Sequence, residues 1–207
     1  FDPGLDEHRR NRRNQLMEIS RALENEEFEL FFQPQIRVTD CELFGFEALI
    51  RWNHPQKGLV SPGEFLPIVE NSHLEVPLGQ WVLKEAIHQM NAWKEAGGNL
   101  AISINISAPH LMDRSFADYL ESYLHSHPEV APGHITLEVL ESTALEDTQR
   151  ASNVLARCQS LGLQVALDDF GTGFSSLTYL RTLPVDIIKI DQSFVRNMLE
   201  DAGDRAI

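Results

Sequence analysis

Strand-like and helix-like segments alternate along most of this chain, and the alternation limits the folds that it can form. Apolar runs of strand length lie at 100–107, 134–141, 163–169 and 185–191, and helical patterns lie between them. Strands that alternate with helices pair in parallel, because each helix carries the chain back across the sheet. The pattern therefore predicts an α/β protein built on a mostly parallel sheet.

The first two strands break this rule. Phe28–Ile36 and Cys41–Trp52 are both strand-like, and the short polar connection 37–40 predicts a hairpin, so we expect this pair to be antiparallel. An amphipathic helix is predicted over His8–Asn25, and a loop over His54–Pro62. Further helices are predicted at Pro62–Asn71, Leu78–Ala96, Pro109–His125 and Leu145–Leu161.

The stretch 163–177, LQVALDDFGTGFSSL, reads as a buried strand, a turn with two glycines and a Ser-rich helix start. Asp168 and Asp169 fall at the end of that strand. In parallel barrels the loops at this end build the active site, so both acids are candidate ligands or bases. The alternative is that Asp169 caps the next helix and Asp168 is merely solvated.

The formal net charge of -14 argues against a nucleic acid polymer or an anionic membrane as partner, because phosphate backbones are bound by stripes of Lys and Arg. An acidic protein can still bind a phosphorylated ligand through divalent cations. The basic cluster at 9–13 reads as the solvated face of the first helix. No apolar run approaches the ~20 residues of a membrane span and no signal peptide is evident, so we expect a cytoplasmic location.

Five polar residues lie late in separate strands, on the faces that carry small or polar side chains. They are Glu47, Asn105, Glu138, Asp168 and Lys189. Each alone is best explained as a structural residue, but closure of the sheet into a barrel would bring them to one mouth. Carboxylates gathered there repel one another unless cations lie between them, and hard oxygen ligands favour Mg²⁺ or Mn²⁺ over zinc.

The adjacent Asp168 and Asp169 suggest two cations, one carboxylate bridging and the other terminal. Two such ions activate a water and stabilise both the attacking and leaving oxygens of a phosphoester. Lys189 is a candidate to hold or activate that water, and Arg51, on the face of Glu47, to clamp a phosphate oxygen. The pattern predicts metal-assisted phosphodiester hydrolysis.

Long motifs in this chain resemble the EAL-domain family of cyclic di-GMP phosphodiesterases, from about Leu23 onward. The motifs are FELFFQPQI, EALIRWNHPQKGLVSPGEFLP, LGQWVL, INIS, LEVLES, DDFGTGFSSLTYLRTLPVD and IKIDQSFV. The resemblance implies a modified (β/α)8 TIM-like barrel with an antiparallel first strand. It also implies hydrolysis of cyclic di-GMP to pGpG with Mg²⁺ or Mn²⁺.

The resemblance carries residue roles over to matching positions. It implies metal ligation by Glu47, Asn105, Glu138 and Asp168, with Asp169 at a second metal and Lys189 near the attacking water. It places Glu47, Asp169 and Lys189 in the catalytic step, and Gln33, Leu49 and Arg51 against the ligand. Glu141 resembles the glutamate that holds the loop after Asp169. That loop and the following helix form the family's dimer contact, so a homodimer is expected.

The domain organisation is also an expectation from the resemblance. Residues 1–22 are expected to form a leader or linker helix, and FDPGLDEHRR resembles the junction that follows a GGDEF domain. Residues 23–207 are expected to form an EAL domain that lacks its last strands, because only six strands are predicted before Ile207 and the family's later motifs are missing. A barrel incomplete at the C-terminus is therefore expected, as is an origin in a larger signalling protein, for which membrane anchoring outside this sequence stays open.

Three functions stay open at this point. The first is a cyclic di-GMP phosphodiesterase, the second is a catalytically silent sensor that binds cyclic di-GMP, and the third is a structural dimerisation domain. Loss of Mn²⁺-dependent activity in Asp168→Ala or Glu47→Ala, with the fold retained, separates the first from the others.

Overall fold

The computed structural model describes residues 3–171 and 181–196. Its helices are α1 (Pro3–Glu24), α2 (Pro62–Val69), α3 (Glu75–Glu95), α4 (Ala108–Leu111), α5 (Phe116–Ser126), α6 (Glu141–Glu146), α7 (Thr148–Ser160) and α9 (Gln192–Arg196), with a 3₁₀ turn at Pro132–His134. Its strands are β1 (Phe28–Arg37), β2 (Glu42–His54), β3 (Gly58–Val60), β4 (Ala101–Ile106), β5 (Ile135–Leu140), β6 (Gln164–Phe170) and β7 (Ile187–Ile190).

The strands form one mixed sheet in the order β1-β2-β4-β5-β6-β7, and β3 pairs with β2. β1 and β2 are antiparallel, whereas β2, β4, β5, β6 and β7 run parallel in succession. The predicted α/β class and the antiparallel first pair are confirmed. Within the described residues the sheet does not close on itself, so β1 and β7 are its two edges.

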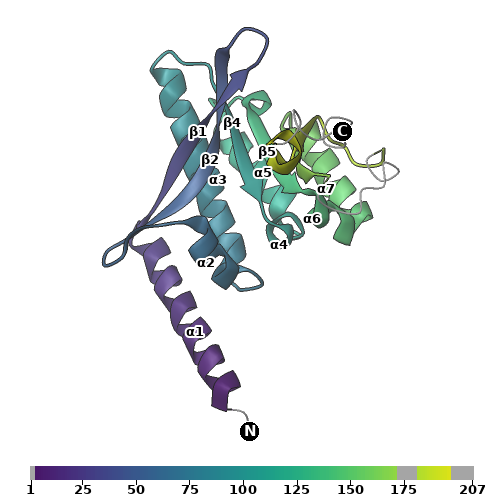
Figure 1. Ribbon diagram of the computed structural model, residues 1–207. Helices are drawn as coiled ribbons and strands as arrows, with labels where there is room; N and C mark the ends of the chain where they lie inside the picture. Colours follow the sequence, from purple (N-terminus) through teal and green to yellow (C-terminus); the bar gives the residue numbers. More distant parts are fainter. Residues whose placement is uncertain (1–2, 172–180, 197–207) are drawn as a thin grey trace.

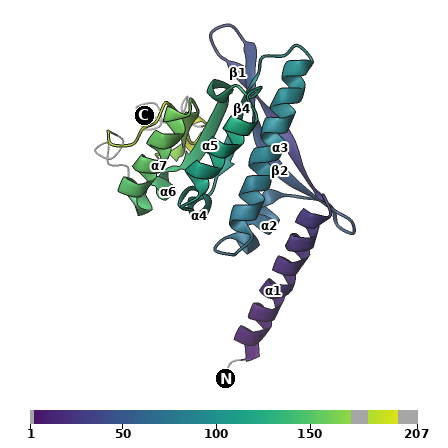
Figure 2. The ribbon, with the colours of Figure 1, turned by 180° about the vertical axis from the view of Figure 1, so that it is seen from behind.

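Helices α3, α5 and α7 cover one face of this sheet, and Figure 2 shows them in front of the strands. The covered face carries branched side chains such as Ile104, Leu137 and Val165, each fully buried. These residues alternate along their strands with small or polar ones, so the small and polar side chains project from the other face of the sheet. The hydrophobic core therefore lies between sheet and helices and leaves the polar face outside it.

Helix α1 runs away from the sheet toward the N-terminus (Figure 1), but its last turns belong to the packed body. Ile19 and Ala22 are buried in a second apolar cluster that includes Phe28 and Trp52. The division of the chain into a leader 1–22 and a domain from 23 stays a prediction.

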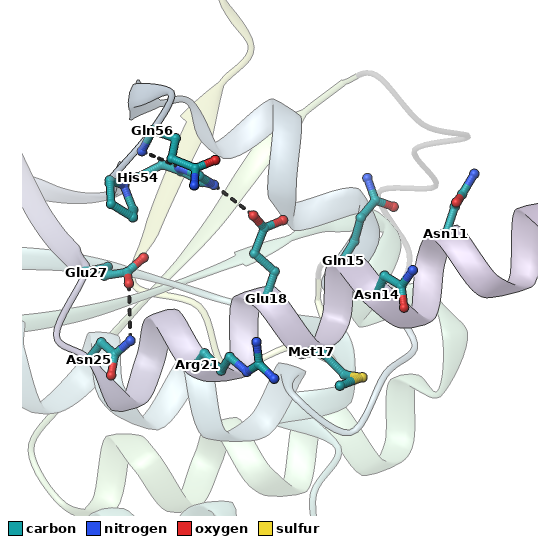
Figure 3. A pocket seen from close by; sticks show the side chains of 11 residues that line it. Asn11, Asn14, Gln15, Met17, Glu18, Arg21, Asn25, Glu27, His54 and Gln56 are labelled. Carbon is teal, nitrogen blue, oxygen red and sulfur yellow. Dashed lines mark hydrogen bonds and ion pairs between the residues drawn. The ribbon is translucent and has the colours of Figure 1, made fainter.

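An open groove of about 710 Å³ lies between α1 and the turn after β2. In Figure 3, Glu18 reaches across from α1 toward His54, and Glu18 Oε1 and His54 Nε2 are 2.9 Å apart. His54 Nδ1 accepts the amide N–H of Gln56 at 3.0 Å and of Lys57 at 3.2 Å, so the ring proton lies on Nε2 and is donated to Glu18. The buried ring of His54 therefore ties α1 to the sheet.

Three predictions about secondary structure were wrong. The segment 54–62, predicted as loop, contains β3, because the turn at 55–57 folds the chain back on β2. The helix predicted at Pro109–His125 is divided into α4 and α5, where Asp113 Oδ1 accepts the N–H of Ser115 at 2.8 Å. The helix predicted at Leu145–Leu161 is likewise divided, since Asp147 caps α7 by accepting the N–H of Arg150. Both breaks occur because aspartate side chains compete for backbone N–H groups.

The helix predicted after Gly173 lies mostly outside the described residues. None of the described helices has the length and apolar character that crossing a membrane requires.

Candidate active site

Side chains from five parallel strands converge on the polar face of the sheet. Strand register places Asn105 beside Glu138 and places Glu47 beside Ser103, so neighbouring strands present these groups side by side. Asn105 Nδ2 donates a hydrogen bond to Glu47 Oε1 at 2.9 Å. The convergence predicted from the sequence is thus present although the described sheet stays open.

Three carboxylates form the centre of the site. Glu47, Glu138 and Asp168 each offer one oxygen, and these three oxygens lie within 4.8 Å of one another. The side chain of Glu138 is only 1% exposed, whereas those of Glu47 and Asp168 are each 19% exposed. The cluster is therefore anchored in the sheet and open on one side.

The ammonium of Lys189 lies between these carboxylates. Its Nζ donates to Asp168 Oδ2 at 3.0 Å, to Glu47 Oε2 at 3.4 Å and to Glu138 Oε2. Burial by itself lowers the pKa of Lys189, but the hydrogen bond and charge of Glu138, followed by Asp168 and Glu47, outweigh burial and raise it. Lys189 is therefore a fixed positive charge at the centre of the acids.

The carboxyl group of Glu138 is the most deeply placed of the three. Burial raises its pKa, while Lys189 and a hydrogen bond from Ser103 act in the opposite direction. Ser103 is a site residue that the motifs did not reveal, although it lies on the predicted polar face of its strand. Gln35 Nε2 donates to Ser103 Oγ at 3.1 Å, so β1 and β4 hold this hydroxyl beside the acid. The alternation of side chains along β1 and β4 could have identified both Gln35 and Ser103 as residues of the polar face.

Asp169 follows Asp168 directly in the chain and has an uncommon backbone conformation, with φ of 54°. Its amide N–H donates to Asp168 Oδ1 at 2.9 Å, which orients the Asp168 carboxylate. Partial burial and then the charge of Asp168 raise the pKa of Asp169. Asp169 is not one of the three residues whose oxygens gather around Lys189.

Glu141, at the start of α6, is 2% exposed and lies beside Gly171, the first residue after β6. Its Oε2 accepts the amide N–H of Gly171 at 3.1 Å. Gly171 has φ of 99°, and a Cβ atom there would come within 2.8 Å of the Phe194 ring, so glycine is required. Glu141 thus contacts the first residue of the loop that it is predicted to hold, and its effect on the rest of the loop stays a prediction.

The residues predicted to bind the ligand lie on the hairpin of β1 and β2. Gln33 is paired with Glu47, and Leu49 is paired with Phe31. The guanidinium of Arg51 lies over the Phe31 ring, with Cζ 5.4 Å from its centroid, and Nη1 donates to the Ile50 carbonyl at 2.8 Å. The register thus places Gln33, Leu49 and Arg51 on the same face of the hairpin as Glu47.

The donor set fits a hard divalent cation. Carboxylate oxygens, with an amide group from Asn105 beside them, are the ligands that Mg²⁺ and Mn²⁺ prefer. Lys189 is hydrogen-bonded to all three acids, so the three carboxylates together stabilise a positive charge. Glu47, Glu138 and Asp168 are the residues that would hold such a cation.

The fold and this site define an α/β barrel-like domain with a cluster of carboxylates, suited to a cation, toward the carboxyl ends of its parallel strands. The family model described as EAL domain matches residues 17–207, and the chain belongs to this family.

Curated relatives and a solved structure agree with that membership. The chain is 37% identical over 208 residues to the bifunctional diguanylate cyclase/cyclic di-GMP phosphodiesterase MucR of Pseudomonas aeruginosa, with 100% of this chain and 30% of that protein covered. It is 39% identical over 199 residues to the cyclic di-GMP phosphodiesterase PA2567 of the same organism, with coverage of 96% and 34%. The chain thus spans about a third of the length of these relatives.

The solved structure described as "PaMucR Phosphodiesterase, c-di-GMP complex" superposes on the fold with a TM-score of 0.86. Its sequence is 39% identical, and the match covers 93% of this chain and 78% of that chain.

Proposed function

We propose that this chain is a metal-dependent phosphodiesterase that hydrolyses cyclic di-GMP to the linear dinucleotide pGpG. The observation that carries the proposal is the gathering of Glu47, Glu138 and Asp168 around Lys189 on the polar face of an EAL domain. Support comes from relatives named as cyclic di-GMP phosphodiesterases and from a similar structure named as a cyclic di-GMP complex.

In this proposal Glu47, Asn105, Glu138 and Asp168 would hold one Mg²⁺ or Mn²⁺, and Asp169 would contribute to a second. Divalent cations there would supply Lewis acidity to the phosphodiester and to a water. The open side of the cluster, where Glu47 and Asp168 are partly exposed, gives the substrate access.

The chain's own residues then divide the work. The Lys189 ammonium, already held by three acids, orients the attacking water and balances negative charge in the transition state. Arg51 is suited to a phosphate oxygen, and Gln33 and Leu49 lie along the same hairpin to contact the nucleotide. Glu141 keeps the loop beyond Asp169 in place through Gly171.

The wider organisation is proposed on the same basis. We propose a cytoplasmic location, a homodimer through the loop and helix after Asp169, and an upstream GGDEF or sensory domain. The name of a relative, a bifunctional diguanylate cyclase/cyclic di-GMP phosphodiesterase, supports the upstream domain. Most of that dimer segment lies outside the described residues.

The test uses cyclic di-GMP with Mn²⁺ and chromatographic analysis of the products. The chain should release pGpG, EDTA should stop the reaction, and Asp168→Asn or Glu47→Gln should reduce kcat/KM by about 100-fold or more. Titration with Mn²⁺ followed by calorimetry should show weaker metal binding in the same variants.

Glu42→Gln is the matched control, because Glu42 is an exposed acid at the far end of β2. It should retain the activity of the parent chain. Binding of cyclic di-GMP without cleavage would favour a sensor, and neither binding nor cleavage would favour a structural domain.

A further inference from the structure

Phe31 is a large aromatic side chain that the hydrophobic core does not use. It is 42% exposed on β1. Its neighbour Phe32 points to the other face of the sheet. The centroid of the Phe32 ring lies 4.9 Å from that of Trp93 and 6.4 Å from that of Phe46. Phe32 thus accounts for the packing of this part of β1, and the ring of Phe31 stays partly open to solvent beside Arg51.

The sheet register places Phe31 on the face of the acidic cluster. Phe31 is opposite Leu49, and Gln33 is opposite Glu47. Directly opposed residues in an antiparallel pair project from the same face, and so do residues two apart on one strand. The Arg51 guanidinium over the Phe31 ring agrees with this, since Arg51 shares the face of Glu47.

The spacing also suits a nucleotide. Two residues along a strand correspond to about 7 Å, so the ring of Phe31 lies one step beyond the Gln33–Glu47 pair. A nucleotide carries its base one ribose away from its phosphate. A phosphodiester at the acids would therefore bring a base toward Phe31 and Leu49.

We propose that Phe31 is a substrate-binding residue that stacks its ring on a guanine base of the cyclic dinucleotide. The inference rests on the proposed function. Aromatic rings form sequence-tolerant platforms for bases, and purines offer the larger stacking surface. The Arg51 guanidinium lies over one face of this ring, with Cζ 5.4 Å from its centroid, so the proposal has the base stack on the opposite face.

The test compares Phe31→Ala, Phe31→Leu and Phe31→Trp in steady-state kinetics with cyclic di-GMP and Mn²⁺. Loss of the ring in the Ala and Leu variants should raise KM by about 10-fold and change kcat little, whereas Trp should retain the KM of the parent chain. With cyclic di-UMP, whose smaller pyrimidines stack less, the same substitutions should have a smaller effect.

Phe44→Ala is the matched control. Phe44 is 40% exposed on β2, but it lies beside Gly45, which pairs with the first residue of β4 at the opposite end of the sheet. It should leave KM unchanged, and thermal unfolding should show all variants folded.

The possible outcomes separate the two proposals. An unchanged KM in Phe31→Ala, equal behaviour of the Leu and Trp variants, or an equal effect of Phe44→Ala would overturn the stacking role while the phosphodiesterase assignment stands. A parent chain that binds without cleaving would refute the enzyme, and dissociation constants of the same variants would then decide the stacking role. A parent chain that neither binds nor cleaves would overturn both.

Discussion

Asp168 Oδ2 lies 3.0 Å from the ammonium of Lys189, across the pairing of β6 with β7. The same ammonium contacts Glu47 and Glu138, so one positive charge serves three negative ones. Lys189 offsets the mutual repulsion of the acids, and hydrogen bonds such as that from Asn105 to Glu47 add to this effect. A bound divalent cation would reduce the same repulsion among the three carboxylates that Lys189 reduces.

Replacing Lys189 with methionine should expose that repulsion. We expect Lys189→Met to lower the free energy of unfolding by roughly 3 kcal/mol in EDTA, because buried Glu138 loses its partner. Added Mn²⁺ should recover part of the loss. Urea unfolding with and without Mn²⁺ measures both effects.

Lys57→Met serves as the control for Lys189. The Lys57 ammonium is exposed and lies 3.8 Å from Glu18, so its loss should cost less than about 1 kcal/mol. Equal midpoints for the Lys189 variant and the parent chain in EDTA would contradict the role of Lys189 as counter-charge.

Glu141 should affect activity through the loop that it holds. Glu141→Ala removes the acceptor for the Gly171 N–H and leaves that donor unpaired, a cost of about 1–3 kcal/mol. We expect lower thermal stability and lower kcat/KM for cyclic di-GMP. Glu141→Gln keeps an acceptor oxygen and should therefore retain more thermal stability and a higher kcat/KM than Glu141→Ala. Equal losses in the two variants would show that Glu141 acts through its charge and not through this hydrogen bond.

Gly79 in α3 should not tolerate alanine, although alanine normally stabilises a helix interior by about 1 kcal/mol. A Cβ atom at Gly79 would come within 2.3 Å of His110 Nδ1, so the overlap should cost about 1–3 kcal/mol and outweigh the helix preference. Chemical denaturation should show a net loss. Gly63→Ala in α2, where the nearest atom is 4.0 Å away, is the control and should be neutral or stabilising.

His110 should make stability depend on pH. It is 1% exposed, and neither ring nitrogen has a hydrogen-bond partner in the described part of the chain. Burial lowers the pKa of His110 to about 4, although the nearby Asp113 carboxylate opposes the shift. The unfolded chain then binds a proton at higher pH than the folded chain, so stability should fall as pH drops from about 6.5 to 4.

The expected total loss from this residue is about 3 kcal/mol over that range. His110→Leu removes the titrating group, so the difference in unfolding free energy between the variant and the parent chain should change between pH 7.5 and pH 4.5. A constant difference over that range would show that His110 does not titrate in this way. Comparing the two chains cancels the contribution of the acidic cluster.

Much of the fold was predictable because it depends on local patterns. Alternation in Phe28–Ile36 and Cys41–Trp52 indicated a hairpin, and the structure has β1 and β2 in nearly these positions. The breaks at Asp113 and Asp147 were missed because a helical pattern of apolar residues continues through both. Side-chain hydrogen bonds to the backbone decide such breaks, and composition alone does not reveal them.

The sequence by itself determined the family, the parallel strand order and the set of acids at the strand ends, because these follow from motifs and from alternation along strands. Only the tertiary structure decided that Lys189 is shared by three carboxylates and that Phe31 extends their face. Those relationships join residues far apart in the chain, such as Glu47 and Lys189, and depend on register between strands. A shift of one residue would have turned these side chains to the opposite face.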